Sequence, residues 1–382
     1  MDRKNNVYLM YAIVFLQGLI FYGPIATLYR QHRGISMYDI FLIESISWIL
    51  MIIFEVPWGF FADRFGYKKT LIISNFIYFF SKIIFYEAHS FGMFLLERVF
   101  LSLALSGISG CDIALLYSSA GEDESEKVIG RYSAVATAGF LAASLLSTAI
   151  VGRSMDETAL LTIIPYGLAA LLTFFLRDIE MAQERRPKLR KSLKNALRNR
   201  QILLIVISAA LGREVIQAVS VFLNQAQYIR SGIDIKYFGI LTAAVQIIPL
   251  SAAKAHAVSE RLGKLSGMLL LYSIIAVSCL TLIFTRSAPL SILCIILAAG
   301  SMSLAAPMAL DMQNKSITTG DRATILSVYA MGGDLIGALF NPVIGGAADV
   351  SVEAAFAVCF IICILVCLTL LIYRKKSKEE II

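Results

Sequence analysis

Long apolar runs separated by short polar segments repeat along the whole chain. Helices need about 20 apolar residues to cross the hydrocarbon core of a bilayer. The runs lack the alternation of period two that marks an outer-membrane barrel, so helices are the remaining spanning element. The pattern predicts an all-α membrane protein with twelve transmembrane helices, at residues 7–28, 39–61, 70–88, 91–118, 130–151, 157–176, 201–226, 236–258, 265–285, 288–312, 323–347 and 351–373.

The cations are distributed unevenly between the polar segments. Of the 34 Lys and Arg residues, 24 lie at the two ends and in or at the edges of every second connection, and six lie in or at the edges of the alternate connections. The remaining four fall inside apolar runs: Lys82, Arg98, Arg213 and Lys254. Because cytoplasmic loops carry the excess of Lys and Arg, we expect a multi-pass protein of the cytoplasmic membrane with both termini in the cytoplasm. The net charge of +7 therefore reflects topology and does not indicate a nucleic-acid partner.

Composition agrees with a polytopic membrane protein. Hydrophobic residues make up 58% of the chain and charged residues 16%, whereas soluble domains have about 45–50% and about 25%. The six cysteines lie in apolar runs, and we expect them to be packing residues. The sequence contains no phosphate-binding loop and no spacing typical of a metal site or a nucleophilic triad. We therefore expect no enzyme activity, no catalytic residues, no metal and no cofactor.

The one long polar connection divides the chain into two halves. It is basic and spans residues 177–200, between six-helix bundles predicted at 1–176 and 201–382. The halves carry a weak repeat, since Asp63-Arg64-Phe65-Gly66 after the second run matches Glu260-Arg261-Leu262-Gly263 after the eighth. Two six-helix halves related by an axis along the membrane normal are found in many secondary transporters. The linker cations would also suit contact with membrane lipid.

A polar stretch between the second and third runs carries the most specific motif. It reads Gly59-Phe-Phe-Ala-Asp63-Arg64-Phe-Gly66-Tyr67-Lys68-Lys69, which we interpret as a tight turn on the cytoplasmic side. The spacing resembles the signature loop of the major facilitator superfamily. The resemblance extends over nearly the whole chain and implies a secondary transporter that works by alternating access. The chain departs from the usual pattern at Tyr67, where a cation is common.

The resemblance implies a set of residues facing a central cavity. In the family, helices 1, 4, 7 and 10 line this cavity and helix 11 flanks it. The corresponding residues here are Gln17, Tyr22, Arg98, Arg213 and Tyr329 for the solute, and Glu214, Asp334 and Glu97 for proton coupling. Adjacent helical residues point about 100° apart, so one member of Glu97/Arg98 and one of Arg213/Glu214 would partner a neighbouring helix. The alternative is that these charges neutralise one another and hold the bundle together.

The resemblance also implies a conformational latch in the signature loop. Asp63 would meet the N-terminal end of helix 11, where free N–H groups and the helix dipole favour a carboxylate. Arg64, Lys68 or Lys69 would pair with Asp112 near the inner end of helix 4. The full latch set is Gly59, Asp63, Arg64, Gly66, Lys68 and Asp112.

The resemblance favours proton-coupled export of a small amphiphilic organic solute by a monomer. The glycine-proline signature that is common in helix 5 of antiporters is absent, since the corresponding stretch reads Thr137-Ala-Gly139-Phe-Leu-Ala-Ala-Ser144. This absence weakens the exporter interpretation without excluding it. An alternative is an uptake symporter for an organic anion or zwitterion. An alternative of another class is a membrane-embedded sensor or lipid-handling protein, which would need an extramembrane domain or a catalytic cluster.

Overall fold

The computed structural model of the 382-residue chain describes residues 4–179, 200–248, 255–317 and 322–379. All regular elements in these ranges are helices. Eleven of them are long and apolar enough to cross a membrane, and a shorter apolar helix covers Ile235–Ile247. The predicted fold class, an all-α membrane protein, is confirmed. The predicted span 236–258 includes residues 249–254, which lie outside the described ranges, as does most of the predicted linker.

The described chain forms two compact units. Unit 1 comprises Met1–Ile35, Ile46–Gln183 and Ile235–Gln246, and unit 2 comprises Ser36–Ser45, Glu184–Asp234 and Ile247–Ile382. Most of residues 4–179 belong to unit 1 and most of residues 200–379 to unit 2, and two segments group with the other unit. These are the first turns of α3 (Met37–Phe65) and the segment that contains η4 (Ile235–Tyr237) and most of α12 (Phe238–Ile247).

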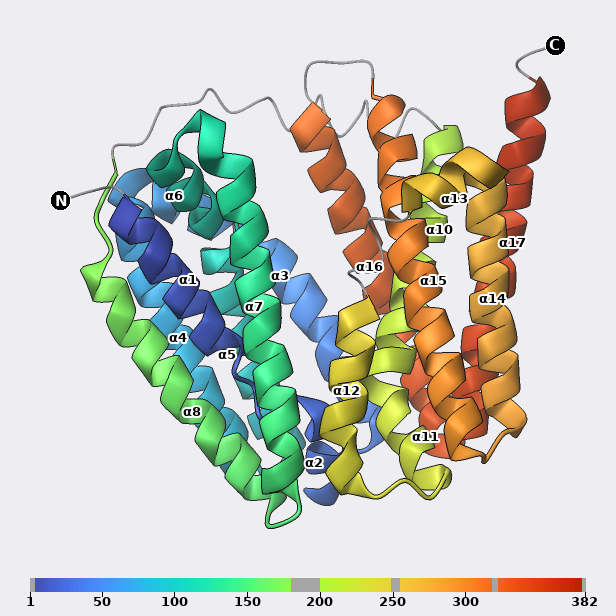
Figure 1. Cartoon of the computed structure of the whole chain (residues 1–382), viewed down its shortest axis with the longest axis horizontal. Coiled ribbons are helices and arrows are strands. Elements are labelled where there is room, and N and C mark those ends of the chain that lie inside the picture. Colours follow the sequence, from blue (N-terminus) through green and yellow to red (C-terminus); the bar gives the residue numbers. More distant parts are fainter. Residues whose placement is uncertain (1–3, 180–199, 249–254, 318–321, 380–382) are drawn as a thin grey trace. The chain divides into compact units, whose positions relative to one another are not determined.

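In unit 1, α1 packs against α7 and α8, and α4 packs against α5 and α8 (Figure 1). A buried apolar cluster joins α1, α4, α6, α7 and α8 around Leu71, Leu115 and Leu116. The elements of this unit are α1 (Lys4–Gly18), η1 (Gly23–Ile25), α2 (Ala26–His32), the rest of α3, α4 (Tyr67–Glu87), α5 (Phe91–Ile108), α6 (Cys111–Ala120), α7 (Glu122–Val151), α8 (Met155–Leu172) and η2 (Thr173–Phe175).

In unit 2, α14 packs between α15 and α17, and α10 contacts α15, α16 and α17 (Figure 1). Cys279, Cys359 and Cys363 are fully buried and carry free thiols, as the sequence predicts for packing residues. The elements are α10 (Arg200–Gln217), the π-helical turn η3 (Ala218–Leu223), α11 (Asn224–Arg230), α13 (Ala255–Leu262), α14 (Lys264–Phe284), α15 (Ala288–Lys315), α16 (Arg322–Val350) and α17 (Val352–Glu379).

The signature stretch differs from the turn that the sequence predicts. The helix α3 continues through Gly59 and Asp63 to Phe65, and α4 begins at Tyr67. The break is confined to Gly66, with φ +89° and ψ 161°. L-residues with a side chain rarely adopt a positive φ, so glycine alone accommodates this corner without strain.

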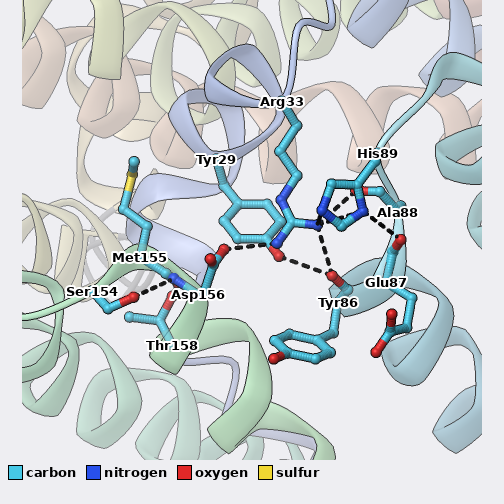
Figure 2. Close-up of polar contacts among 10 residues, drawn as sticks. All are labelled: Tyr29, Arg33, Tyr86, Glu87, Ala88, His89, Ser154, Met155, Asp156 and Thr158. Carbon is cyan, nitrogen blue, oxygen red and sulfur yellow. Dashed lines mark hydrogen bonds and ion pairs between the residues drawn. The ribbon is translucent and has the colours of Figure 1, made fainter.

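A cluster of polar contacts around Arg33, which we call the Arg33 cluster, joins helix ends in unit 1 (Figure 2). Arg33, at the end of α2, donates hydrogen bonds of 2.8 Å to the carbonyls of Tyr86, in the last turn of α4, and of Ala88, just after that helix. Its other nitrogen lies 2.7 Å from Oδ1 of Asp156 in the first turn of α8. The guanidinium also lies 4.6 Å from the centroid of the Tyr29 ring. One side chain therefore links the ends of three helices.

Candidate functional site

Gln17 lies at the end of α1 in unit 1 and joins neighbouring helices. Its side-chain amide donates to Oδ1 of Asn75 in α4 at 2.6 Å. Its backbone carbonyl accepts a hydrogen bond of 2.6 Å from the Tyr166 hydroxyl of α8. The predicted solute contact of Gln17 stays a prediction, but its described contacts are those of a residue that positions α4 and α8.

Lys82 of α4 lies at the centre of a buried site that the sequence did not predict. The residue is 2% exposed, and its Nζ donates to the Tyr22 hydroxyl at 2.9 Å. The ammonium lies 5.5, 4.8 and 4.9 Å from the ring centroids of Tyr22, Tyr78 and Tyr166. We call these three rings the tyrosine cage. Its sequence signal was a lysine inside an apolar run, and the aromatic partners come from distant parts of the chain.

The tyrosine cage compensates in part for burial of the charge. Tyr22 is 6% exposed and stacks on Phe85 with a centroid distance of 4.0 Å, so it faces Lys82 within the unit. A cation over an aromatic face gains about 0.5–2 kcal/mol. Burying an ion costs several kcal/mol. The stacking of Tyr22 on a solute stays a prediction.

Glu97 and Arg98 of α5 interact with each other. The Oε2 atom of Glu97 lies 3.7 Å from Nε of Arg98 and 4.0 Å from a guanidinium nitrogen of Arg30 in α2. Glu97 is 1% exposed. Arg30 also lies 5.2 Å from the centroid of the Phe85 ring. Glu97 is therefore enclosed by two cations. Proton coupling through Glu97 and solute contact by Arg98 stay predictions.

In unit 2, Arg213 of α10 and Asp334 of α16 form an ion pair. The guanidinium donates to Oδ1 of Asp334 at 2.6 Å. The two side chains are 42% and 22% exposed, although both lie within spans. Charged side chains in spans face the bundle interior or a water-filled space, because exposure to hydrocarbon is costly. The sequence predicted both residues at the site but not their pairing.

Glu214, the neighbour of Arg213, is enclosed in the packed interface with α16. It is fully buried, and neither carboxylate oxygen has a hydrogen-bond partner among the described residues. The carboxylate lies directly against Gly337, where an added Cβ would be 2.9 Å from the carboxyl carbon. Asn341 is also fully buried and lies one turn further along the same face of α16. Glu214 thus occupies a closed niche made by the absence of a side chain at Gly337.

Other polar groups of unit 2 make contacts along α3, α10 and α16. Gln217, one turn after Glu214 in α10, donates to Oε1 of Glu44 in α3 at 3.0 Å. Asp349, near the end of α16, accepts a hydrogen bond of 2.7 Å from the backbone N–H of Met37. Tyr329 is 6% exposed and belongs to an apolar cluster with Ile202, Val206, Ile317 and Ile325, so its solute contact stays a prediction.

The predicted latch residues of unit 1 lie around the corner between α3 and α4. Asp112 accepts hydrogen bonds from the backbone N–H of Ile113 at 2.7 Å and from the Tyr132 hydroxyl at 3.1 Å. Arg64 lies over the ring of Phe65, with 5.3 Å between the guanidinium carbon and the centroid. Gly59 and Asp63 belong to the last turns of α3, and Lys68 to the first turn of α4. The pairings of Asp63 and of Asp112 with a cation stay predictions.

The matching corner of unit 2 carries an ionic cluster. Lys264 at the start of α14 contacts Asp311 of α15, and Lys315 lies 3.3 Å from the same carboxylate. These residues line a groove of about 540 Å³ together with His256 and Glu260. In the part of the chain that the structure describes, no three His, Cys, Asp or Glu side chains are arranged to hold a metal.

Comparison with known proteins places this architecture in a large group of transporters. The profile of the Major Facilitator Superfamily matches residues 7–340. The MFS-type transporter YxaM of Bacillus subtilis (strain 168) is 25% identical over 212 residues, which are 52% of this chain and 53% of that protein. A transporter of Buchnera aphidicola subsp. Schizaphis graminum (strain Sg) is 30% identical over 130 residues, which are 33% of each chain. The chain thus matches about half, or less, of the length of these curated relatives.

Solved structures share the fold over almost the full length. The crystal structure of the nucleoside transporter NupG superposes with a TM-score of 0.81 and 15% identity, covering 99% of this chain and 100% of that one. A bacterial homolog of the human lysosomal transporter Spinster has a TM-score of 0.75 and 15% identity, covering 97% and 95%. Identities at this level establish a common fold and leave the solute open.

Proposed function

Because the chain belongs to the major facilitator superfamily, as its signature stretch predicts, we propose that it exports a small amphiphilic organic solute in exchange for protons. The family assignment makes the chain a multi-pass secondary transporter and not an enzyme. The coupling to protons, the nature of the solute and the direction of transport are our proposal.

The observation that carries the proposal is the environment of Glu214. Burying an isolated carboxylate in its charged form costs several kcal/mol unless hydrogen bonds or a cation compensate. The carboxylate oxygens of Glu214 have no hydrogen-bond partner among the described residues. We infer that this group carries a proton while its niche is closed and releases it when the niche is hydrated. A carboxylate that alternates in this way couples proton movement to conformation.

The Arg213–Asp334 pair supports an amphiphilic solute. Both charged groups are accessible within spans, and they present opposite signs side by side. A solute with a polar or charged group would exchange hydrogen bonds with this pair, whereas apolar residues around it would contact the remainder. Export is the common role among twelve-helix relatives of this length, and we adopt it as the direction.

A second candidate is uptake of an organic anion. The guanidinium of Arg213 is 42% exposed, so it is accessible for a bidentate contact with a carboxylate. The two candidates predict opposite directions of solute transport in energised vesicles.

The solute class is tested first by thermal unfolding of the purified full chain. A ligand at about 100 times its dissociation constant stabilises the protein by about 2.7 kcal/mol. We would use ethidium as an amphiphilic cation, benzoate as an aromatic anion and uridine as a nucleoside, the last because NupG is named a nucleoside transporter. Stabilisation by benzoate and not by ethidium would favour the second candidate.

The coupling is tested by Glu214→Gln in proteoliposomes with an imposed pH gradient, using whichever of these three probes stabilises the chain most. We expect gradient-driven transport to fall about 100-fold, as for other groups that transfer protons, while exchange at equal pH continues. Glu157→Gln, at an exposed carboxylate in α8, is the matched control and is expected to retain full activity. Full gradient-driven transport by Glu214→Gln would contradict the proposal.

A further inference from the structure

We propose that Lys82 is a second proton-exchanging residue of the transport cycle, in unit 1, in addition to Glu214 in unit 2. This inference rests on the proposed coupling to protons, but it concerns a different residue and a different chemical group. It starts from a lysine that is 2% exposed inside a helical bundle and is surrounded by the tyrosine cage.

The contacts of Lys82 suit both protonation states of its amine. A hydroxyl oxygen accepts a hydrogen bond from an ammonium, and the same hydroxyl donates to the lone pair of a neutral amine. Tyr22 is placed for either role, at 2.9 Å from Nζ. Tyr166 is fixed by its own hydrogen bond to the Gln17 carbonyl, so its ring stays beside the amine in both states. The site therefore does not need to rearrange when the proton leaves.

Carboxylates that would keep the amine charged are engaged elsewhere. Among the described ion pairs, which extend to 4.0 Å, none includes Lys82. The nearby carboxylate, Glu97, is paired with Arg30 and Arg98. The groups that face Lys82 are thus Tyr78 on its own helix, Tyr22 before η1, Tyr166 of α8, Glu97 and Arg98 of α5, and Arg30 of α2.

The residue type matters as much as the site. A guanidinium stays charged under all conditions that proteins meet, whereas a buried lysine amine readily loses its proton. The transfer is simple: when the cage opens to water, the ammonium gives one proton to water and becomes a neutral amine, and the amine later takes one proton from hydronium. Charge and atoms balance without another reactant.

The first experiment observes the amine directly. The full chain is prepared in lipid nanodiscs with ¹⁵N-labelled lysine, and the Lys82 side-chain resonance is assigned by its loss in Lys82→Arg. We expect it to change from charged to neutral at a pH at which the resonances of exposed lysines still report charged amines. Tyr22→Phe, which keeps the lysine and removes its hydroxyl partner, should shift this transition to lower pH and identifies the resonance if Lys82→Arg fails to fold.

The second experiment connects the proton to transport. Lys82→Arg retains a cation that cannot release its proton, so pH-gradient-driven transport of the chosen probe should fall at least about tenfold while exchange at equal pH persists. A Lys82 resonance that stays unchanged over the whole pH range, or gradient-driven transport that Lys82→Arg leaves intact, would overturn the inference. The Glu214→Gln variant separates the two proposals. The change of the Lys82 resonance with pH is expected to persist in this variant, even if Glu214→Gln abolishes or leaves unchanged the gradient-driven transport.

Discussion

At the scale of single residues, the niche of Glu214 depends on the missing side chain at Gly337. A methyl group at this position would lie 2.9 Å from the carboxyl carbon of Glu214, which has no room to retreat in a fully buried site. We expect Gly337→Ala to destabilise the chain by about 1–3 kcal/mol, the usual cost of overpacking. Thermal unfolding of the purified protein measures this effect.

Gly332 provides a matched control on the same helix. An added Cβ there would meet no atom within 4 Å, and alanine is the better helix former by about 1 kcal/mol. Gly332→Ala should therefore be neutral or stabilising. If the two variants unfolded at the same temperature, the packing of Glu214 against Gly337 would not be the feature that sets stability here.

The residues of the candidate site were only partly predictable. The sequence predicted Glu97, Arg213, Glu214 and Asp334 as cavity residues, because an ionisable residue in an apolar run is conspicuous and the family resemblance gives such residues a role. It did not reveal that Arg213 pairs with Asp334 whereas Glu214 is left without a hydrogen-bond partner among the described residues, since that depends on the rotation of α10 against α16. Lys82 was equally conspicuous, but its cage is assembled from α4, α8 and the turn before η1, which no local pattern connects.

At the scale of helices, the order of the apolar spans was predictable and the interruptions within them were not. The predicted helix at 91–118 is divided into α5 and α6 by Gly110, which has φ +82°. The predicted helix at 201–226 contains the π-helical turn at 218–223. Each interruption lies within a longer apolar run, so a hydropathy average over about 20 residues does not detect it. π-helical turns within α-helices are frequent at functional sites, and this one follows directly after Gln217.

The Arg33 cluster gives a prediction about how helix ends are joined. Arg33→Lys loses the planar fork that bonds the carbonyls of Tyr86 and Ala88 and the carboxylate of Asp156. We expect a loss of about 1–3 kcal/mol in the free energy of unfolding, because partly buried acceptors lose their donors. Asp156 is 60% exposed, so Asp156→Asn should cost less than about 1 kcal/mol.

The exposed Arg153 just before α8 is the control for Arg33→Lys, and Arg153→Lys should leave stability unchanged. Thermal unfolding compares the three variants. A larger effect for Asp156→Asn than for Arg33→Lys would mean that the ion pair, and not the bonds to the carbonyls, holds these helix ends.

At the scale of the whole molecule, the weak sequence repeat reappears as backbone geometry. Gly263 separates α13 from α14 with φ +75° and ψ 151°, close to the φ +89° and ψ 161° of Gly66 between α3 and α4. Matched corners at matched positions agree with a duplicated six-helix unit. The two segments that group with the other unit, Ser36–Ser45 and Ile235–Gln246, also lie at matching positions of the repeat. Each contains the start of the second apolar run in its half of the sequence, at residue 39 or residue 236.

The orientation of the chain in the membrane follows from its cations and is open to a direct test. Because 24 of 34 Lys and Arg residues lie in one set of alternating segments, we expect that set, with both termini, in the cytoplasm. Fusions in a bacterial host would end after Lys376 or after Arg286, and each would carry either green fluorescent protein or alkaline phosphatase. Fluorescence is expected at Lys376 and phosphatase activity at Arg286, since the first protein matures in the cytoplasm and the second outside it. The reverse pattern would invert the topology, and it would place the signature corner at Gly66 on the outer side, where the proposed latch of Asp63 would close the opposite face of the transporter.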